Sequence, residues 1–278
     1  MVLIDGRELA KEIRENLAEK VKTFKTKPKL AVILCGDDEA SKVYVKIKSK
    51  ACQEVGIEYD EYVLTTSSTQ DDLMKLIKKL NNDKSVNGIL LQYPLPQTID
   101  YYKAAEFIKP EKDVDGFNPV NVGWLSIGKP TFIPCTPYGI MKMFEKYNIE
   151  LQGKKAVIIG RSNIVGKPMA QLLLSKNATV TTCHTKTKNI EDEVKQADIV
   201  ISATGHRNMV TANMVKEGAV VIDVGVSRKE DGSLCGDVDF DNVKNIASYI
   251  TPSPGGVGPM TVATLMENTV KAYEMQNK

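Results

Sequence analysis

The sequence predicts an α/β protein of two domains, each built on a parallel β-sheet covered by helices. Short apolar segments alternate with segments of helical periodicity over residues 30–92, and the alternation returns over residues 137–224. Strands that alternate with helices in this way are typical of parallel sheets. Between the two regions lies a polar segment rich in glycine and proline, residues 110–136, where we place the domain junction.

The first expected element is an amphipathic helix near the N-terminus. Asp5 and Glu8 have the spacing of a capping box. The apolar side chains that share one face of this helix are Leu9, Ile13, Leu17 and Val21. The segment lacks a secretory apolar region, and its repeated glutamates argue against an acid-poor transit peptide.

The remaining elements follow from the apolar pattern. In the first alternating region we expect strands at 30–35, 61–65 and 88–92 and helices at 40–55 and 70–81. In the second we expect helices at 137–147 and 166–176 and strands at 155–160, 178–183, 198–203 and 219–224. A final helix runs from Pro259, in its first turn, to about Gln276.

Composition excludes several classes of function. The 37 basic residues are nearly matched by 35 acidic ones, so the net charge of +2 gives no reason to expect a nucleic acid or membrane partner. Five widely spaced cysteines suggest neither a disulfide framework nor a metal site, and they favour a reducing cytoplasm. Only His184 and His206 are present, so any proton transfer falls to lysine, tyrosine or a carboxylate.

A Rossmann-type turn is expected after the strand that ends at Gly160. Gly160 permits a tight strand-to-helix turn, and the N-terminus of the next helix would offer N–H groups to phosphate. The turn departs from GxGxxG, since Ser162 replaces the second glycine and Gly166 comes one residue late. By itself the pattern is equally compatible with an ordinary strand–helix connection.

The end of the following strand indicates the cofactor. Enzymes selective for NAD place a carboxylate there to bind the ribose hydroxyls, whereas residues 181–186 contain none. Arg161 in the preceding turn and Thr185 could instead bind a ribose phosphate, which favours NADP over NAD. His184 is a weaker candidate, with a structural role as the alternative.

The helix expected at 40–55 carries the strongest catalytic candidate. Ser41, Tyr44 and Lys48 share one side of it, next to an apolar stripe made by Val43, Ile47 and Ala51. A lysine beside the core is the alternative for Lys48. A YxxxK pair also occurs in short-chain dehydrogenases, but there the glycine-rich turn precedes it, and here the order is reversed.

Two loops and one strand end complete the candidate site. Gln92 stands at the carboxyl end of an apolar strand, where α/β sheets place binding residues, although it could equally bond a loop backbone. The acidic run 110–117 and the Pro- and Gly-rich run 252–261 suit binding loops, with ordinary surface turns as the alternative. In the first loop Asp113 is expected to cap a turn.

These motifs resemble those of the bifunctional methylenetetrahydrofolate dehydrogenase/cyclohydrolase family. The matching segments are Ser41-x-x-Tyr44-x-x-x-Lys48, the strand that ends Gln92-Tyr93-Pro94, residues 110–117, Gly160-Arg-Ser-x-x-Val-Gly-x-Pro168 and residues 252–261. They occur in family order along nearly the whole chain. Tyr93 is a departure, because the family commonly has leucine there.

The resemblance implies an N-terminal α/β catalytic domain and a C-terminal Rossmann-type doubly wound domain, with a cleft between them. It assigns residues 1–135 and 265–278 to the folate-binding domain and 136–264 to the NADP-binding domain. The implied reaction oxidises 5,10-methylenetetrahydrofolate with NADP and then hydrolyses the methenyl product to 10-formyltetrahydrofolate. A member with only the dehydrogenase activity and a non-catalytic nucleotide-binding protein remain as alternatives.

The resemblance also assigns roles. Lys48 would transfer protons in the hydrolysis, Gln92 would orient its amine, Tyr44 would stack on the folate, and Asp115 would bind the pterin. The implied substrate-binding residues are Ser41, Tyr44, Gln92, Asp115, Pro254, Gly255, Gly256 and Val257. The implied cofactor-binding residues are Thr136, Gly160, Arg161, Ser162, Ile164, Val165, His184, Thr185, Thr204, Gly205, Gly225, Gly258 and Thr261. The resemblance implies no metal. It implies a cytoplasmic homodimer that contributes to purine biosynthesis.

Overall fold

A computed structural model gives the fold of residues 1–277, which divides into two compact units. The three-stranded unit comprises residues 11–135 and the chain from Val262 onward; the six-stranded unit comprises residues 1–10 and 136–261. By its internal contacts the chain divides after Ala10, Cys135 and Thr261, and the functional domain boundaries given above stay predictions. Residues 1–10, expected with the folate-binding domain, belong instead to the six-stranded unit, because their strand pairs with its sheet.

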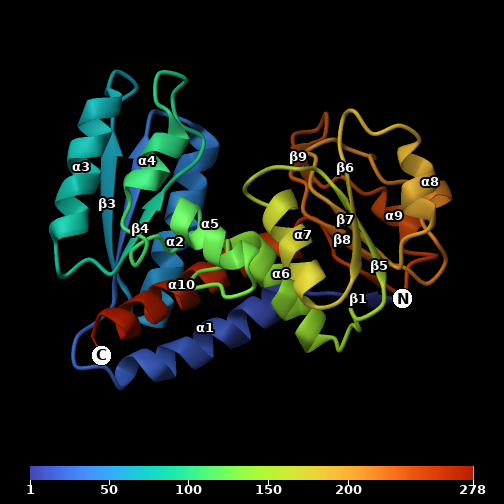
Figure 1. Cartoon of the computed structure of the whole chain (residues 1–278), viewed down its shortest axis with the longest axis horizontal. Coiled ribbons are helices and arrows are strands. Elements are labelled where there is room, and N and C mark those ends of the chain that lie inside the picture. Colours follow the sequence, from blue (N-terminus) through green and yellow to red (C-terminus); the bar gives the residue numbers. More distant parts are fainter. Residues whose placement is uncertain (278) are drawn as a thin grey trace. The chain divides into compact units, whose positions relative to one another are not determined.

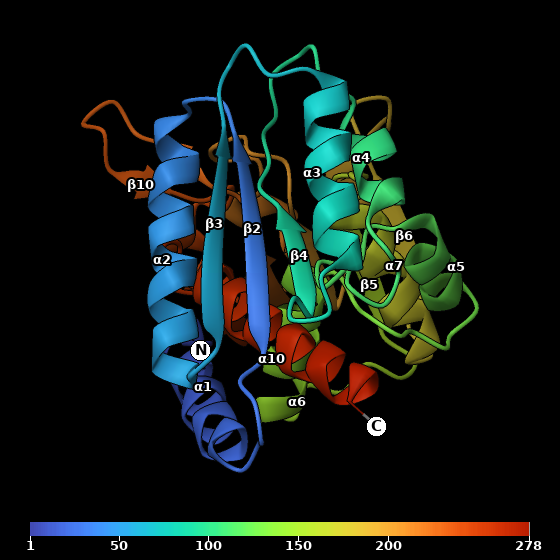
Figure 2. The ribbon, with the colours of Figure 1, turned by 90° about the vertical axis from the view of Figure 1, so that its left-hand side faces the viewer.

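The three-stranded unit contains a parallel sheet of β2 (Lys29–Cys35), β3 (Glu58–Leu64) and β4 (Gly88–Leu91), in the order β3-β2-β4. Figure 2 shows the strands side by side between α2 (Glu39–Val55) and α3 (Gln70–Asn82). The apolar strand β2 is central and buried, whereas the edge strand β3 begins with charged residues and is only partly buried. Charged residues on an edge strand discourage pairing with another chain.

Two long helices complete the hydrophobic core of this unit. From α10 (Val257–Gln276), Leu265, Met266 and Val270 pack with the β2 residues Leu30 and Val32, as the sequence led us to expect. From α1 (Gly6–Lys22), Leu17 and Val21 join the same cluster.

The start of α1 differs from a full capping box. Asp5 Oδ1 accepts hydrogen bonds from the N–H groups of Arg7 (2.8 Å) and Glu8 (3.3 Å), so half of the box forms. The backbone N–H of Asp5, which Glu8 was expected to bind, donates to the hydroxyl of Tyr147 at 2.9 Å. The tertiary fold therefore supplies the acceptor that the local sequence was expected to provide.

The six-stranded unit is a parallel sheet in the order β1-β11-β8-β7-β5-β6. Its strands are β1 (Val2–Leu3), β5 (Lys155–Ile159), β6 (Thr179–Cys183), β7 (Ile199–Ser202), β8 (Val220–Asp223) and β11 (Tyr249–Ile250). In Figure 1 its central strands lie between α7 (Gly166–Ser175) on one side and α8 (Ile190–Lys195) and α9 (Phe240–Val243) on the other. The chain passes from β5 to β6 in one direction and then to β7 on the opposite side of β5. This reversal creates a switch point, the usual place for ligands in such sheets.

Several short elements were not expected. They are the strands β1 and β11, the helices α4 (Tyr101–Phe107), α5 (Pro119–Ser126), α8 and α9, the 3₁₀ helix η1 (Ala212–Met214) and the strand pair β9 (Ser227–Arg228) and β10 (Leu234–Cys235). Helix α6 (Cys135–Lys146) begins two residues earlier than expected. Each new element is too short to show a clear period, and α5 depends on a cap, in which Asn118 Oδ1 accepts from Val120 N at 2.8 Å.

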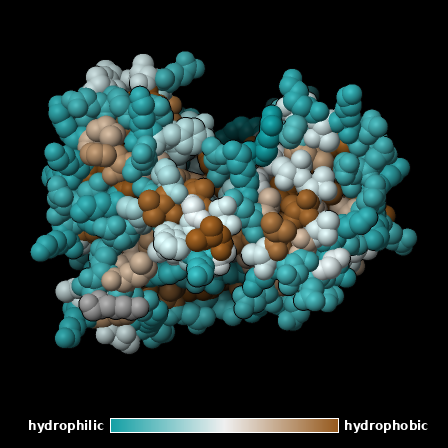
Figure 3. Space-filling view, in the orientation of Figure 1, coloured by the Kyte–Doolittle hydropathy of each residue, from teal (hydrophilic) through white to brown (hydrophobic). Residues whose placement is uncertain are grey.

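Polar residues dominate the face of the molecule shown in Figure 3. Apolar residues appear there in small groups, one of them over α5, where Val120, Val122 and Ile127 are exposed. Among residues 1–277, no helix is long and apolar enough to cross a membrane. All five cysteines are buried and free.

Candidate active site

The centre of the site in the three-stranded unit is a hydrogen bond between Lys48 on α2 and Gln92 directly after β4. Lys48 Nζ donates to Gln92 Oε1 at 2.7 Å. The amide of Gln92 donates from Nε2 to the carbonyl of Tyr93, also at 2.7 Å, which turns Oε1 toward the lysine. Gln92 is buried, so its amide holds the amine in one position. The family resemblance led us to expect that Gln92 would orient this amine, and the two side chains are hydrogen-bonded.

Lys48 lies on the buried face of α2, and the expected apolar stripe was mostly wrong. Val43 and Ile47 are 56% and 46% exposed, whereas Ala51 is buried as expected. The side of α2 that faces the core carries Ser41, Val45, Cys52 and Val55, and Lys48 has the same helical spacing. Val43 and Ile47, spaced i and i+4, led us to predict the wrong face of α2 as the core face, because the sheet packs against the neighbouring face.

Burial and a nearby carboxylate set the charge of this lysine. Loss of solvent lowers the pKa of Lys48, and the carboxylate of Asp115 partly opposes that shift. Burial likewise raises the pKa of Asp115, and the amine of Lys48 opposes that shift. The two groups form a coupled acid–base pair in a poorly solvated place. A lysine with a lowered pKa can release and recover a proton near neutral pH.

Cys135 is a member of this cluster that the sequence reasoning missed. Its thiol is hydrogen-bonded to Asp115 and lies 3.5 Å from the carbonyl oxygen of Val114. Burial raises the pKa of Cys135 well above its ordinary value, so the thiol stays neutral and can donate to the carboxylate. The only signal in the sequence was its place beside Thr136 at the domain junction.

Ser41 and Tyr44 offer polar groups on the same helix. Ser41 Oγ is buried and lies beside the carboxylate of Asp38, whose pKa the hydroxyl lowers, but it makes no hydrogen bond of good geometry within the part of the chain that the structure describes. The Tyr44 side chain is 39% exposed, one turn from Lys48. A buried hydroxyl without a well-formed hydrogen bond is costly, which makes Ser41 a candidate to bind a ligand.

Asp113 shapes the loop that presents Asp115. Its two oxygens accept hydrogen bonds from Gly116 N (3.1 Å), Asn118 N (2.7 Å) and Asn121 Nδ2 (2.8 Å). It therefore caps the turn, as expected. Burial, the dominant influence, raises the pKa of Asp113 to about 6 despite these bonds.

This raised pKa predicts a pH-dependent effect of Asp113→Asn. Between about pH 4 and pH 6 folded Asp113 keeps a proton that the unfolded chain has lost, so its contribution to stability falls as pH rises through that window. Asparagine does not titrate. We expect the substitution to lower the free energy of unfolding at both pH values. The loss should be smaller at pH 7.5 than at pH 5, by roughly 1 kcal/mol. Urea unfolding of both proteins at the two pH values measures this, and an equal loss would contradict the assignment.

The predicted dinucleotide turn forms at the switch point of the six-stranded sheet. Gly160 has φ +119°, and a Cβ there would lie 2.5 Å from the carbonyl oxygen of Ala203, so the turns after β5 and β7 touch. A Cβ at Gly166 would lie 2.1 Å from the carbonyl oxygen of Gly160. Both positions require glycine, which gives these residues the structural role that the sequence suggested.

Ser162 accepts hydrogen bonds from the N-terminus of α7, where we had expected N–H groups that are free to bind phosphate. Its hydroxyl accepts from Val165 N at 3.1 Å and Gly166 N at 3.4 Å, and its carbonyl accepts from Lys167 N at 3.0 Å. These three N–H groups are therefore not free for phosphate. Ile164 is half-buried and Val165 is buried, so both contribute more to the shape of the turn than to exposed polar surface.

The end of β6 has the features of an NADP site. Residues 184–188 contain no carboxylate, and Arg161 is exposed, with no acidic partner within ion-pair distance among residues 1–277. His184 belongs to the turn itself: its N–H donates to Thr187 Oγ1 at 2.8 Å, and its Nδ1 accepts from Lys186 N at 3.1 Å. Thr185 is exposed.

The other predicted cofactor residues lie on connected loops of the same unit. Thr136 and Thr261 stand at the two ends of the segment 136–261, and their hydroxyl groups are hydrogen-bonded to each other at 2.9 Å. Thr204 and Gly205 follow β7, Gly225 follows β8, and Gly258 is exposed at the start of α10. The Thr204 hydroxyl is engaged within the protein, since it donates to Asp237 at 2.9 Å and accepts from His206 N at 3.1 Å.

The predicted substrate loop, Pro254 to Val257, also belongs to the six-stranded unit. The carbonyl of Gly255 accepts from Gly6 N at 3.1 Å, and a Cβ at Gly6 would lie 1.8 Å from the carbonyl oxygen of Gly256. Pro254 is exposed and Val257 is buried. The start of α1 therefore fixes the backbone of this loop.

Comparison with known families accounts for this arrangement. The profile described as "Tetrahydrofolate dehydrogenase/cyclohydrolase, catalytic domain" matches residues 4–115, and the corresponding NAD(P)-binding domain profile matches residues 134–277. The chain belongs to the tetrahydrofolate dehydrogenase/cyclohydrolase family.

Family relatives match along nearly their full length. The bifunctional protein FolD of Acetivibrio thermocellus is 52% identical over 99% of this chain and 98% of its own. The crystal structure of the bifunctional FolD enzyme from Campylobacter jejuni has a TM-score of 0.98 at 52% identity, covering 99% of both chains. The Trypanosoma brucei dehydrogenase–cyclohydrolase, solved with NADP and an inhibitor, has a TM-score of 0.96 at 40% identity, covering 100% of this chain and 99% of that one.

The two units carry different residues of the predicted site. The three-stranded unit carries Lys48, Gln92 and Asp115, and most of it lies within the catalytic-domain match. The six-stranded unit carries the glycine turn and the switch point, and most of it lies within the NAD(P)-binding match. The order of the two family domains along the chain thus agrees with the kinds of residue found in each unit.

Proposed function

We propose that this protein is a bifunctional, NADP-dependent methylenetetrahydrofolate dehydrogenase and methenyltetrahydrofolate cyclohydrolase. It oxidises 5,10-methylenetetrahydrofolate to the methenyl compound and hydrolyses that compound to 10-formyltetrahydrofolate. The observation that carries this proposal is the hydrogen bond of 2.7 Å between Lys48 and Gln92, in a setting that lowers the pKa of the lysine. It favours the bifunctional enzyme over a dehydrogenase alone, because only the hydrolysis needs a group that moves protons.

The first step asks the protein mainly for positioning. NADP, when bound, supplies the hydride acceptor, and two nitrogen lone pairs beside the one-carbon bridge of the substrate favour loss of hydride. No base is needed at the reacting carbon. Tyr44, exposed one turn from Lys48, stacks on the folate, while Ser41 Oγ and Asp115 provide polar contacts to it.

The second step needs proton transfer. Water adds to the methenyl carbon, and the ring opens when one of its nitrogens receives a proton. The amine of Lys48 takes a proton from the water and delivers it to the leaving nitrogen as the carbon–nitrogen bond breaks, and the remaining hydroxyl proton is released to solvent as the formyl C=O forms. Gln92 keeps the amine oriented. The Asp115 carboxylate stabilises the positive charge on the amine, and the Cys135 thiol beside that carboxylate stays neutral.

A spectrophotometric assay tests the proposal. Purified protein should reduce NADP when given 5,10-methylenetetrahydrofolate, and should separately consume methenyltetrahydrofolate in the absence of NADP. Reduction of NADP without accelerated hydrolysis would favour the dehydrogenase-only alternative. Absence of both activities would favour a non-catalytic nucleotide-binding protein.

Cofactor choice is expected to depend on Arg161. The guanidinium is exposed at the turn after β5 and has no ion-pair partner among residues 1–277, and the end of β6 has no carboxylate to select NAD. Arg161→Ala should therefore raise the KM for NADP about tenfold or more, the usual scale for a lost charged contact, and leave the KM for NAD nearly unchanged. Initial rates with each cofactor measure this. Equal effects on both would mean that Arg161 does not bind the ribose phosphate.

The wider biological setting rests on family membership alone. We infer a homodimer that forms through the nucleotide-binding unit, a cytoplasmic location, and a contribution to purine biosynthesis through 10-formyltetrahydrofolate. The nearly balanced charge of the chain supports a small-molecule substrate without a nucleic acid partner.

A further inference from the structure

A buried carboxylate in the six-stranded unit joins the ends of its central strands. Asp237, which follows β10, is fully buried. Its Oδ2 accepts three hydrogen bonds, from Ser202 Oγ (2.9 Å), Thr204 N (2.7 Å) and Thr204 Oγ1 (2.9 Å). Ser202 ends β7 and Thr204 follows it, so this carboxylate fixes the chain where β7 leaves the sheet.

The second oxygen of Asp237 lies against the end of the next strand. Oδ1 is buried and has no hydrogen-bond partner among residues 1–277. A Cβ on Gly225 would lie 1.9 Å from this oxygen, so the backbone after β8 packs directly against it. One side chain therefore determines how far apart the loops after β7 and β8 can lie.

A second aspartate holds Asp237 in place. Asp223 at the end of β8 accepts from Asp237 N (2.9 Å), Val238 N (3.0 Å) and Gly225 N (3.0 Å). A Cβ on Gly236 would lie 1.9 Å from Asp223 Oδ2. The segment 236–238 is therefore locked against the sheet, and the Asp237 carboxylate has little freedom to move.

This arrangement lies beside the switch point. The turn at Gly160 touches the carbonyl oxygen of Ala203, next to Thr204. Since the Thr204 hydroxyl is bound to Asp237 and to His206 N, it shapes the loop 203–206 and has no proton left to donate to a ligand. A displacement of this loop would move the surface against which the dinucleotide turn packs.

We propose that Asp237 is a positioning residue for the cofactor: without touching NADP, it holds the loops after β7 and β8 in the shape that binds it. The proposal rests on NADP binding as part of the proposed function. A role limited to stability would lower the free energy of unfolding without changing the affinity of the folded protein for NADP.

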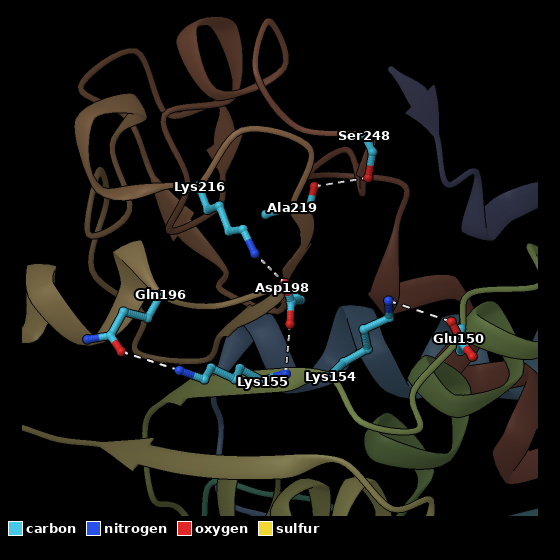
Figure 4. A network of polar contacts seen from close by, with 8 residues as sticks. All are labelled: Glu150, Lys154, Lys155, Gln196, Asp198, Lys216, Ala219 and Ser248. Carbon is cyan, nitrogen blue, oxygen red and sulfur yellow. Dashed lines mark hydrogen bonds and ion pairs between the residues drawn. The ribbon is translucent and has the colours of Figure 1, made fainter.

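The test compares substitutions at the two ends of β7. Asp237→Ala removes all three bonds, whereas Asp237→Asn keeps a carbonyl oxygen for the same donors. The matched control is Asp198→Ala at the amino end of the same strand, where the carboxylate accepts from Lys155 N (2.9 Å) and Lys216 Nζ (2.6 Å) in the network of Figure 4. NADPH binding is measured by fluorescence titration well below the unfolding temperature, alongside steady-state kinetics and thermal unfolding.

We expect Asp237→Ala to raise the Kd for NADPH about tenfold or more, the usual scale for lost bonds to a charged group, with kcat at saturating NADP and the KM for folate nearly unchanged. Asp237→Asn should restore most of the affinity. Asp198→Ala should lower the unfolding temperature yet bind NADPH as the wild type does. Wild-type affinity in Asp237→Ala, or an equal loss in Asp198→Ala, would overturn the proposal.

A milder variant covers the case in which Asp237→Ala does not fold. Thr204→Val keeps the shape of the side chain but removes the hydroxyl that links Asp237 to the loop. It should weaken NADPH binding about fivefold, in line with the loss of one or two hydrogen bonds, and unchanged affinity would count against the proposal. A wild-type protein that binds no NADPH would instead refute the proposed function itself.

Discussion

Replacing Lys48 with methionine should abolish most of the cyclohydrolase activity and leave more of the dehydrogenase activity. Methionine has similar length and bulk but no amine, so the buried face of α2 should stay packed. Loss of a general acid–base group typically costs about 10²-fold or more in rate. The dehydrogenase rate should fall by a smaller factor, because Lys48 only orients the folate in that step.

Hydrolysis of methenyltetrahydrofolate and reduction of NADP, measured on the same preparation, give the ratio of the two effects. Lys46→Met is the matched control, since this lysine lies on the exposed side of the same helix and should leave both rates unchanged. A folded Lys48→Met protein that hydrolyses the substrate at the wild-type rate would end the assignment.

The second large effect is expected from Gly160→Ala. A side chain at φ +119° is strained, and its Cβ would lie 2.5 Å from the carbonyl oxygen of Ala203. Strain and overpacking together should cost about 2–5 kcal/mol of unfolding free energy. Because the clash displaces the turn at the switch point, the Kd for NADPH should rise at least about tenfold as well.

Gly153→Ala separates the two causes. Gly153 precedes β5 and also has a positive φ, +74°, but a Cβ there would meet nothing within 4 Å. This variant carries only the conformational strain, about 1–2 kcal/mol, and should bind NADPH normally. Chemical unfolding and NADPH titration of both variants decide the matter. Similar affinities in the two variants would show that the contact with Ala203 is unimportant.

The two units use buried ionisable side chains in different ways. In the three-stranded unit, burial lowers the pKa of the Lys48 amine and raises that of the Asp115 carboxyl, which moves both toward the range useful for proton transfer. Burial raises the pKa of the Cys135 thiol as well, so this group stays neutral. In the six-stranded unit, two buried carboxylates hold loops together: Asp223 accepts hydrogen bonds from three backbone N–H groups, and Asp237 accepts from one backbone N–H and two hydroxyl groups. The first unit is suited to chemistry, and the second to holding loops in a fixed shape.

The sequence by itself determined the local elements and the kinds of residue in the site. The apolar runs predicted every strand of four or more residues to within three residues at either end. In the interior strands the reason is that buried parallel strands are almost uniformly apolar, whereas β3 and β6 carry polar residues and are only partly buried. The glycine turn at 160–166 and the missing carboxylate after β6 could also be read directly. Each depends on a few adjacent residues, for which the local chain leaves little freedom.

Only the tertiary structure decided which side chains meet. The face of α2 that packs on the sheet, and therefore the burial of Lys48, could not be read from helical spacing, because Val43 and Ile47 imitate a core face. Cys135 contacts Asp115, and Asp237 contacts Ser202, across 20 and 35 residues of chain. Such contacts are set by how the strands are ordered in a sheet, and hydrogen bonds and pKa values depend on that order rather than on neighbours in sequence.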